Sequence, residues 1–180
     1  MPLTARLSHG ESLGDRVLKV DHAGEHGAVC IYKAQRWFAR WRAPEMVAEI
    51  DEFILHEQQH RSKFGAELTR RNRARCKSYW LCGIGGLALG ALTGLAGRQA
   101  IAATTVAVER VVLRHLEDQA NALASTDAAA VSVIRAIILD EQTHHDRSAA
   151  HLPPGGIWQQ ILDPIVSAST EAVIWLGMKL

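Results

Sequence analysis

Four glutamates and two histidines stand in this 180-residue chain at spacings that suit a shared metal site. The pattern Glu-x-x-His occurs at Glu57–His60 and at Glu141–His144, and a single glutamate precedes each copy at the same interval, Glu25 and Glu109. Residues three apart on an α-helix lie on one face, so the carboxylate and the imidazole of one pattern can reach the same ion. The sequence therefore predicts two similar halves around one site.

The neighbours of these groups indicate that they point inward. Each Glu-x-x-His interrupts an apolar helical stripe, after Ile54 in the first copy and after Ile138 in the second. Buried carboxylates are costly unless they are compensated, and two divalent cations would balance four glutamates. One glutamate from each of two helices, with Glu-x-x-His from each of two others, is the pattern of di-iron and di-manganese carboxylate proteins. We therefore predict a catalytic centre whose metal ligands are Glu25, Glu57, His60, Glu109, Glu141 and His144.

The elements that must position these residues are helices, because helical periodicity dominates and alternating strand patterns are nearly absent. The fold class is therefore all-α, a four-helix bundle with an apolar insert before its third helix and an extra C-terminal amphipathic helix. We expect that last helix to be interrupted near Pro164. The expected bounds are 14–42, 44–73, a third helix that follows the insert and ends near 124, 128–151, and 157–180 for the C-terminal helix.

Composition places the chain in the globular class. Apolar residues make up 48%, charged residues 22%, and the formal net charge is +1, which excludes wholesale disorder and gives no electrostatic case for nucleic acid. The three cysteines form no Cys-x-x-Cys pair, so a disulfide framework or a cysteine zinc site is not expected. The first residues lack the apolar stretch of a secretory signal. We expect one domain over 1–180, with residues 1–13 disordered.

Residues 78–97 form an uncharged segment of transmembrane length. Glycines recur in it at every fourth position from Gly86 on, which is typical of close helix packing. A spanning helix would separate Glu109 from Glu25, so both ends should lie on one side and the segment should attach the protein to a membrane surface. Five basic residues at 70–77 would then meet anionic headgroups. Burial in the bundle or in a dimer contact is the alternative.

The chain contains the motifs VDHAGEHGA at 20–28, HEQQH at 56–60, GLALGA at 86–91, TVAVE at 105–109 and DEQTHHD at 140–146. These motifs resemble those of the Coq7 family, the demethoxyubiquinone hydroxylases, and they follow in the family's order. The resemblance implies a ferritin-like di-iron monooxygenase of ubiquinone biosynthesis, with the same six residues as iron ligands. It further implies hydroxylation of the ring of 2-polyprenyl-3-methyl-6-methoxy-1,4-benzoquinol (demethoxyubiquinol) with O₂, two Fe²⁺ ions per chain, and NADH or another reductant as electron source.

The resemblance also implies a location and partners. We expect a peripheral, monotopic membrane protein on the cytoplasmic side of a bacterial inner membrane, or on the matrix side of the mitochondrial inner membrane in a eukaryote. The expected partners are a polyprenyl quinone, the membrane surface, and a second copy of the chain or other ubiquinone-biosynthesis proteins; no nucleic acid is expected.

Two short stretches depart from the family's pattern. Val29-Cys30 stands where the family usually has Asn-Arg, and Leu116 stands where it usually has a tyrosine. Tyr32, seven residues after Glu25 on the same face, is expected either to hydrogen-bond in the site or to pack in the core.

Three alternative functions stay open. A membrane-bound di-iron quinol oxidase also uses two Glu-x-x-His motifs. A ferritin-like iron-handling protein would share the bundle, but it needs no apolar insert of this length. A metal-free protein that binds isoprenoid lipids would explain the insert and leave four inward glutamates unexplained.

Overall fold

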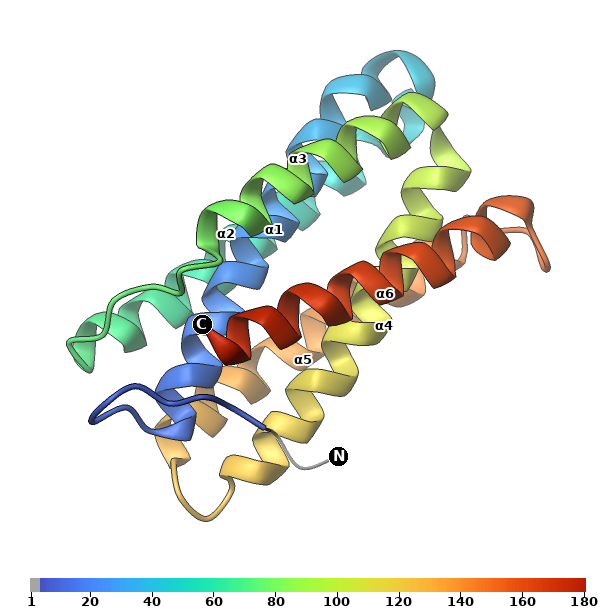
Figure 1. The fold of residues 1–180 in the computed structure, drawn as a ribbon. Helices are drawn as coiled ribbons and strands as arrows, with labels where there is room; N and C mark the ends of the chain where they lie inside the picture. Colours follow the sequence, from blue (N-terminus) through green and yellow to red (C-terminus); the bar gives the residue numbers. More distant parts are fainter. Residues whose placement is uncertain (1–3) are drawn as a thin grey trace.

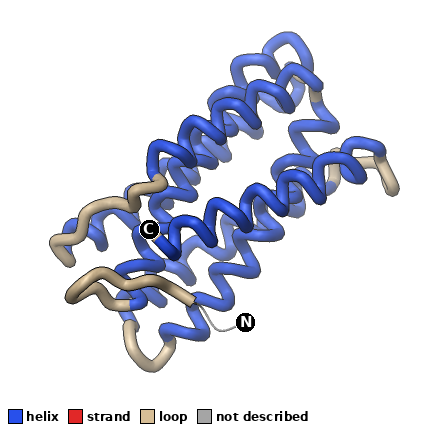
Figure 2. Tube along the Cα trace, viewed as in Figure 1, coloured by secondary structure: helices blue, strands red, loops and turns tan. Residues whose placement is uncertain are grey.

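The structure, a computed structural model, describes residues 4–180. Its regular elements over that range are all helices, joined by loops, which confirms the all-α class (Figures 1 and 2). A 3₁₀ turn, η1, lies between the first two helices, and every other regular element is an α-helix. The elements are α1 (Leu13–Arg42), η1 (Pro44–Met46), α2 (Val47–Arg70), α3 (Tyr79–Ala96), α4 (Arg98–Leu123), α5 (Ala128–Ala149) and α6 (Ile157–Lys179).

Two helical hairpins, α1–α2 and α4–α5, form the four-helix bundle, while α3 lies along α1 and α6 lies along α4 (Figure 1). The core of the bundle has two apolar layers. One layer contains Leu18 and Phe64, and the other contains Ile50, Phe53 and Ile101. The predicted ligands occupy the helix segments between these layers, so apolar packing on both sides holds the four helices in register around them.

The glycines of α3 allow it to pack closely against α1. A Cβ atom at Gly86 would overlap the carbonyl oxygen of Gly27, and one at Gly90 would overlap the carbonyl oxygen of Ile31. The opposite face of α3 is exposed and carries large apolar side chains, with Ile84 as an example. Both features expected of residues 78–97, a close-packing glycine face and an apolar surface, therefore occur on opposite sides of one helix.

Two helices, α3 and α6, are long and apolar enough to cross a membrane, judged by length and composition. Only 39% of the apolar window of α3 and 17% of that of α6 are buried inside the protein. This is weak support for contact with a membrane, because core helices of soluble proteins can have the same length and composition.

Two expectations from the sequence differ from the structure. Helix α6 continues through Pro164, where we expected an interruption. Proline leaves the carbonyl of the residue four earlier, Gln160, without its helical donor, but Gln160 is exposed to water. The fully buried Val166 packs against α4 just beyond the proline, so tertiary packing outweighs the local defect.

The N-terminal segment is the second difference. Of the residues expected to be disordered, 1–3 lie outside the described part of the chain. Residues 4–12 have specific contacts, because the buried carboxylate of Glu11 pairs with Arg16 at 2.7 Å and with Lys19 at 2.8 Å. The backbone N–H of Arg6 also donates a 2.9 Å hydrogen bond to the carbonyl of Met178 in α6. Charge pairs and a backbone hydrogen bond therefore hold this segment in place. The periodicity of apolar residues gives no information about such pairs.

Candidate metal centre

The six predicted ligands come together inside the bundle. Glu25 lies on α1, Glu57 and His60 on α2, Glu109 on α4, and Glu141 and His144 on α5, and all six are buried. Their donor atoms form two groups of four residues, and within each group all the atoms lie within 4.8 Å of one another. Both groups contain Glu57 and Glu141; the first adds Glu25 and His60, and the second adds Glu109 and His144. The two halves predicted from the sequence thus share two carboxylates.

One ring nitrogen of each histidine faces the carboxylates. His60 Nδ1 lies 2.9 Å from Glu141 Oε1, and His144 Nδ1 lies 3.2 Å from Glu57 Oε1 and 3.3 Å from Glu141 Oε2. These atoms are buried, and yet neither nitrogen, Glu57 Oε1 nor either Glu141 oxygen makes a well-aligned hydrogen bond. Buried polar atoms without partners are rare and costly. Carboxylate and imidazole atoms that face one another without hydrogen-bond partners are suited to bind a pair of divalent cations.

The other ring nitrogen of each histidine is held from outside the centre. His60 Nε2 lies 3.0 Å from Asp140 Oδ2, and His144 Nε2 lies 3.0 Å from His56 Nδ1. A partner on Nε2 orients the ring and leaves Nδ1 available to an ion. Sequence reasoning missed these two supports. A signal was present, because Asp140 and His56 each stand directly before the glutamate of a Glu-x-x-His pattern.

The charges at the centre are strongly coupled. Burial, followed by repulsion from neighbouring carboxylates, raises the pKa of Glu25, Glu57 and Glu109 well above the usual value. Burial acts on Glu141 in the same sense, but His144 and His60 outweigh it and lower its pKa. Without metal, protons and imidazoles must therefore offset part of the negative charge. Bound cations would take over that role and allow all four carboxylates to ionise.

Tyr32 belongs to the centre by contact. Its hydroxyl donates a 2.7 Å hydrogen bond to Glu109 Oε1, and both residues are buried. The Tyr32 ring also packs in the apolar core beside Phe53, so the structure shows both expected roles, the hydrogen bond and the core packing.

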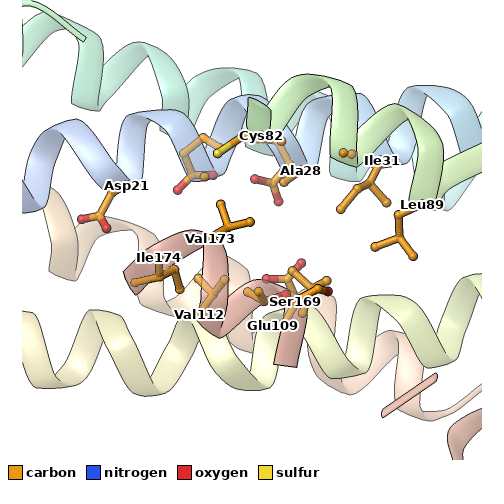
Figure 3. A pocket seen from close by; sticks show the side chains of 18 of the residues that line it. Asp21, Ala28, Ile31, Cys82, Leu89, Glu109, Val112, Ser169, Val173 and Ile174 are labelled. Atoms are coloured by element: carbon orange, nitrogen blue, oxygen red, sulfur yellow. The ribbon is translucent and has the colours of Figure 1, made fainter. Parts of the chain in front are cut away.

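A cavity of about 370 Å³ opens beside the carboxylates, between α1 and α3 on one side and α4 and α6 on the other (Figure 3). Carboxylates of the candidate centre, among them Glu25 and Glu109, reach the cavity. Its walls are mostly apolar, with Ile31, Leu89 and Val112 as examples. This volume lies within the range of small-molecule pockets. The arrangement can hold an apolar ring beside a metal pair and exclude water from both.

The chain is similar to known proteins over most of its length. The family described as "Ubiquinone biosynthesis protein COQ7" matches residues 12–177. The chain is 30% identical to a "3-demethoxyubiquinol 3-hydroxylase" of Rhodospirillum rubrum over 166 residues, which cover 92% of this chain and 78% of the relative. It is 33% identical to a mitochondrial "NADPH-dependent 3-demethoxyubiquinone 3-hydroxylase" of Mus musculus over 168 residues, 91% of this chain and 76% of the relative.

Proposed function

The chain belongs to the COQ7 family of ubiquinone biosynthesis proteins, and from that membership we propose that it is a 3-demethoxyubiquinol 3-hydroxylase that uses two iron ions and O₂. The observation that carries the proposal is the placement of the six predicted ligands beside an apolar cavity. A metal pair alone would also suit iron storage. A metal pair that faces a pocket for an apolar ring supports an oxygenase.

Glu57 and Glu141 would contact both ions, because each belongs to both groups of ligands. Glu25 and His60 would complete the shell of one ion, and Glu109 and His144 would complete the other. When bound, ferrous ions supply the electrons and the Lewis acidity that activate O₂. The protein contributes buried, oriented donors, and the apolar walls keep water from the reacting atoms.

The cavity mouth supports a membrane-bound substrate. Leu81 and Leu92 of α3 line the cavity and are also exposed at the surface, next to α6. The outer faces of both helices carry exposed apolar side chains, including Ile84 and Ile165. We propose that these faces lie against the bilayer, so that the ring enters between α3 and α6 while the polyprenyl tail stays in lipid. Relatives from mammals are named NADPH-dependent, which supports NADPH or NADH as reductant.

The test is a single-turnover reaction with labelled oxygen. The full chain is loaded anaerobically with about two Fe²⁺ ions, given a short-chain demethoxyquinol, and exposed to ¹⁸O₂. Mass spectrometry should find one labelled oxygen atom on the ring. Glu109→Ala should abolish the label, whereas Glu117→Ala, an exposed glutamate two turns further along α4, should not. Consumption of O₂ with an unlabelled ring would point instead to a quinol oxidase, and oxidation of Fe²⁺ without any need for quinol would point to iron handling.

A further inference from the structure

A polar pair, the half-buried Asp21 and the buried Gln119, joins α1 to α4 beside the cavity. Gln119 Nε2 donates a 2.9 Å hydrogen bond to Asp21 Oδ1, and Gln119 is 1% exposed. Asp21 is one of the residues that line the cavity, one helical turn before Glu25, and Figure 3 shows its carboxylate projecting from α1 at one end of it. It is the carboxylate of the lining that is not among the predicted metal ligands.

Two oxygen atoms of this pair have no partner. Asp21 Oδ2 and Gln119 Oε1 are both buried, and neither makes a hydrogen bond. Both atoms accept hydrogen bonds, so only a donor can satisfy them. A buried acceptor without a donor costs free energy, and a native protein usually supplies a partner or a ligand. Asp21 lines the cavity, and a hydroxyl group of a ligand that reached this carboxylate would supply the missing donor.

Two other polar groups of the lining already have partners. His115 also lines the cavity, but its Nε2 lies 2.8 Å from Glu171 Oε2. The hydroxyl of Ser169 donates to the carbonyl of Val166 within α6. Asp21 is thus the unpaired carboxylate that an entering ring meets outside the metal centre.

The redox forms of the substrate differ in the group that Asp21 would meet. A benzoquinol has two O–H donors, whereas the corresponding benzoquinone has only carbonyl acceptors. An acceptor in a dry pocket favours the donor and opposes another acceptor. The names of the relatives include both forms, demethoxyubiquinol and demethoxyubiquinone, and therefore do not decide between them.

We propose that Asp21, held in place by Gln119, accepts a hydrogen bond from a ring hydroxyl and selects the reduced quinol over the oxidised quinone. This inference rests on the proposed function, since it needs a quinol in the cavity. Burial raises the pKa of Asp21 to about 7, against a smaller opposite effect of the Gln119 hydrogen bond, so the acceptor role needs a pH above neutrality. At pH 8 most of the Asp21 carboxyl groups are then ionised and purely accepting.

The experiment compares the affinities for the two redox forms without turnover. The full chain is loaded with Zn²⁺, which exchanges no electrons with the ligand and suits the same donors. Equilibrium dialysis under anaerobic conditions at pH 8 gives Kd for a short-chain demethoxyquinol and for its quinone. The wild-type protein should prefer the quinol by at least about ten-fold, the worth of one hydrogen bond to a charged group. Asp21→Asn presents an amide donor in the same volume and should lose or reverse that preference.

Two further variants keep the result interpretable. Asp118→Asn removes the same charge beside Gln119 but outside the cavity lining, and the preference should remain. Gln119→Leu removes the group that holds Asp21 and should reduce the preference while quinol still binds. An equal preference in wild type and Asp21→Asn, with quinol bound by both, overturns the role of Asp21 and leaves the labelled-oxygen test unaffected. Failure of the wild-type protein to bind either form, together with an unlabelled ring, overturns the proposed function and this inference together.

Discussion

The hydroxyl of Tyr32 donates a 2.7 Å hydrogen bond to Glu109 Oε1, which links α1 to α4 at the candidate metal centre. Burial, together with the nearby carboxylate of Glu109, raises the pKa of Tyr32 well above its usual value, so the phenol stays protonated and remains a donor. Glu109 is the predicted single-glutamate ligand of one half of the site. The hydrogen bond orients it from α1, the helix that carries Glu25, the corresponding ligand of the other half.

Tyr32→Phe should weaken both folding and metal binding. The substitution leaves a buried carboxylate oxygen without its donor, which costs about 1–3 kcal/mol of unfolding free energy in the metal-free protein. Loss of an orienting partner should reduce the affinity for Fe²⁺ by roughly ten-fold or more. Urea denaturation and anaerobic metal titration measure the two effects. An unchanged metal affinity would show that Glu109 needs no support from Tyr32.

Asp140→Asn should weaken one metal position more than the other. Asp140 holds His60 through Nε2, and an amide cannot replace the negative charge that strengthens this contact. We expect the affinity for Fe²⁺ to fall about 10- to 100-fold in one of the two binding steps, which is the range typical of such supporting contacts. Calorimetric titration with Fe²⁺ resolves the steps. The control is Asp146→Asn, an exposed aspartate on the same helix, which should leave both steps unchanged.

The metal-free protein should lose stability as pH rises, whereas stabilisation by bound metal should increase. In the metal-free protein the pKa values of Glu25, Glu57 and Glu109 are raised, so the folded state holds protons that the unfolded state has lost. Their contribution to stability is greatest at low pH and falls as pH rises through the folded pKa values. His60, whose pKa is also raised, contributes in the same direction.

In the window from about pH 7 to about pH 9, Asp21, whose pKa is raised to about 7, and Cys82, whose pKa is raised to about 11, act in the same direction as the three glutamates. We expect the denaturation midpoint of the metal-free protein to fall across the window. Metal binding requires ionised carboxylates, so the stabilisation by Fe²⁺ or Zn²⁺ should grow over the same range. A stabilisation by metal that is independent of pH would contradict the predicted ligand set.

Gly90→Ala should destabilise the protein although alanine favours helices. The new Cβ would overlap the carbonyl oxygen of Ile31 and force α3 away from α1, at a cost of about 1–3 kcal/mol. Gly85→Ala, on the same helix, meets nothing within 4 Å and should stabilise by roughly 0.5–1 kcal/mol. Thermal or urea unfolding of both variants gives the comparison, and equal effects would show that α3 does not depend on close packing.

Polar substitutions on the outer face of α3 should release the protein from membranes. Ile84 is 68% exposed and Leu92 is 69% exposed, so Ile84→Ser with Leu92→Ser removes apolar contact area without disturbing the core. Flotation with vesicles of a neutral and an anionic phospholipid should show at least a ten-fold loss of binding. The reason is that burial of each large apolar side chain contributes about 1.5 kcal/mol or more. Leu139→Ser changes a 76% exposed leucine on α5 and should float like the wild type. Equal flotation of the double variant and the wild type would remove α3 from the proposed membrane face.

Much of the candidate centre was predictable because its pattern lies within single helices. Residues three apart share a face by helix geometry alone, so the sequence placed Glu57 beside His60 and Glu141 beside His144 before any tertiary contact was known. The interrupted apolar stripes showed that these faces point inward. The same reasoning predicted that glycine spacing in 78–97 marks a packed face, which the structure places against α1.

Contacts between helices depended on the tertiary structure. Local periodicity does not state which ring nitrogen of His60 faces the carboxylates, or that Asp140 on another helix holds the opposite nitrogen. It likewise gave no sign of the Asp21–Gln119 pair, whose members are far apart in the chain. At Pro164 a local preference gave the wrong prediction, because packing on α4 outweighs the tendency of proline to break a helix. The sequence by itself therefore determined the helices and the residue types on each face, and packing of the bundle decided which of those faces meet.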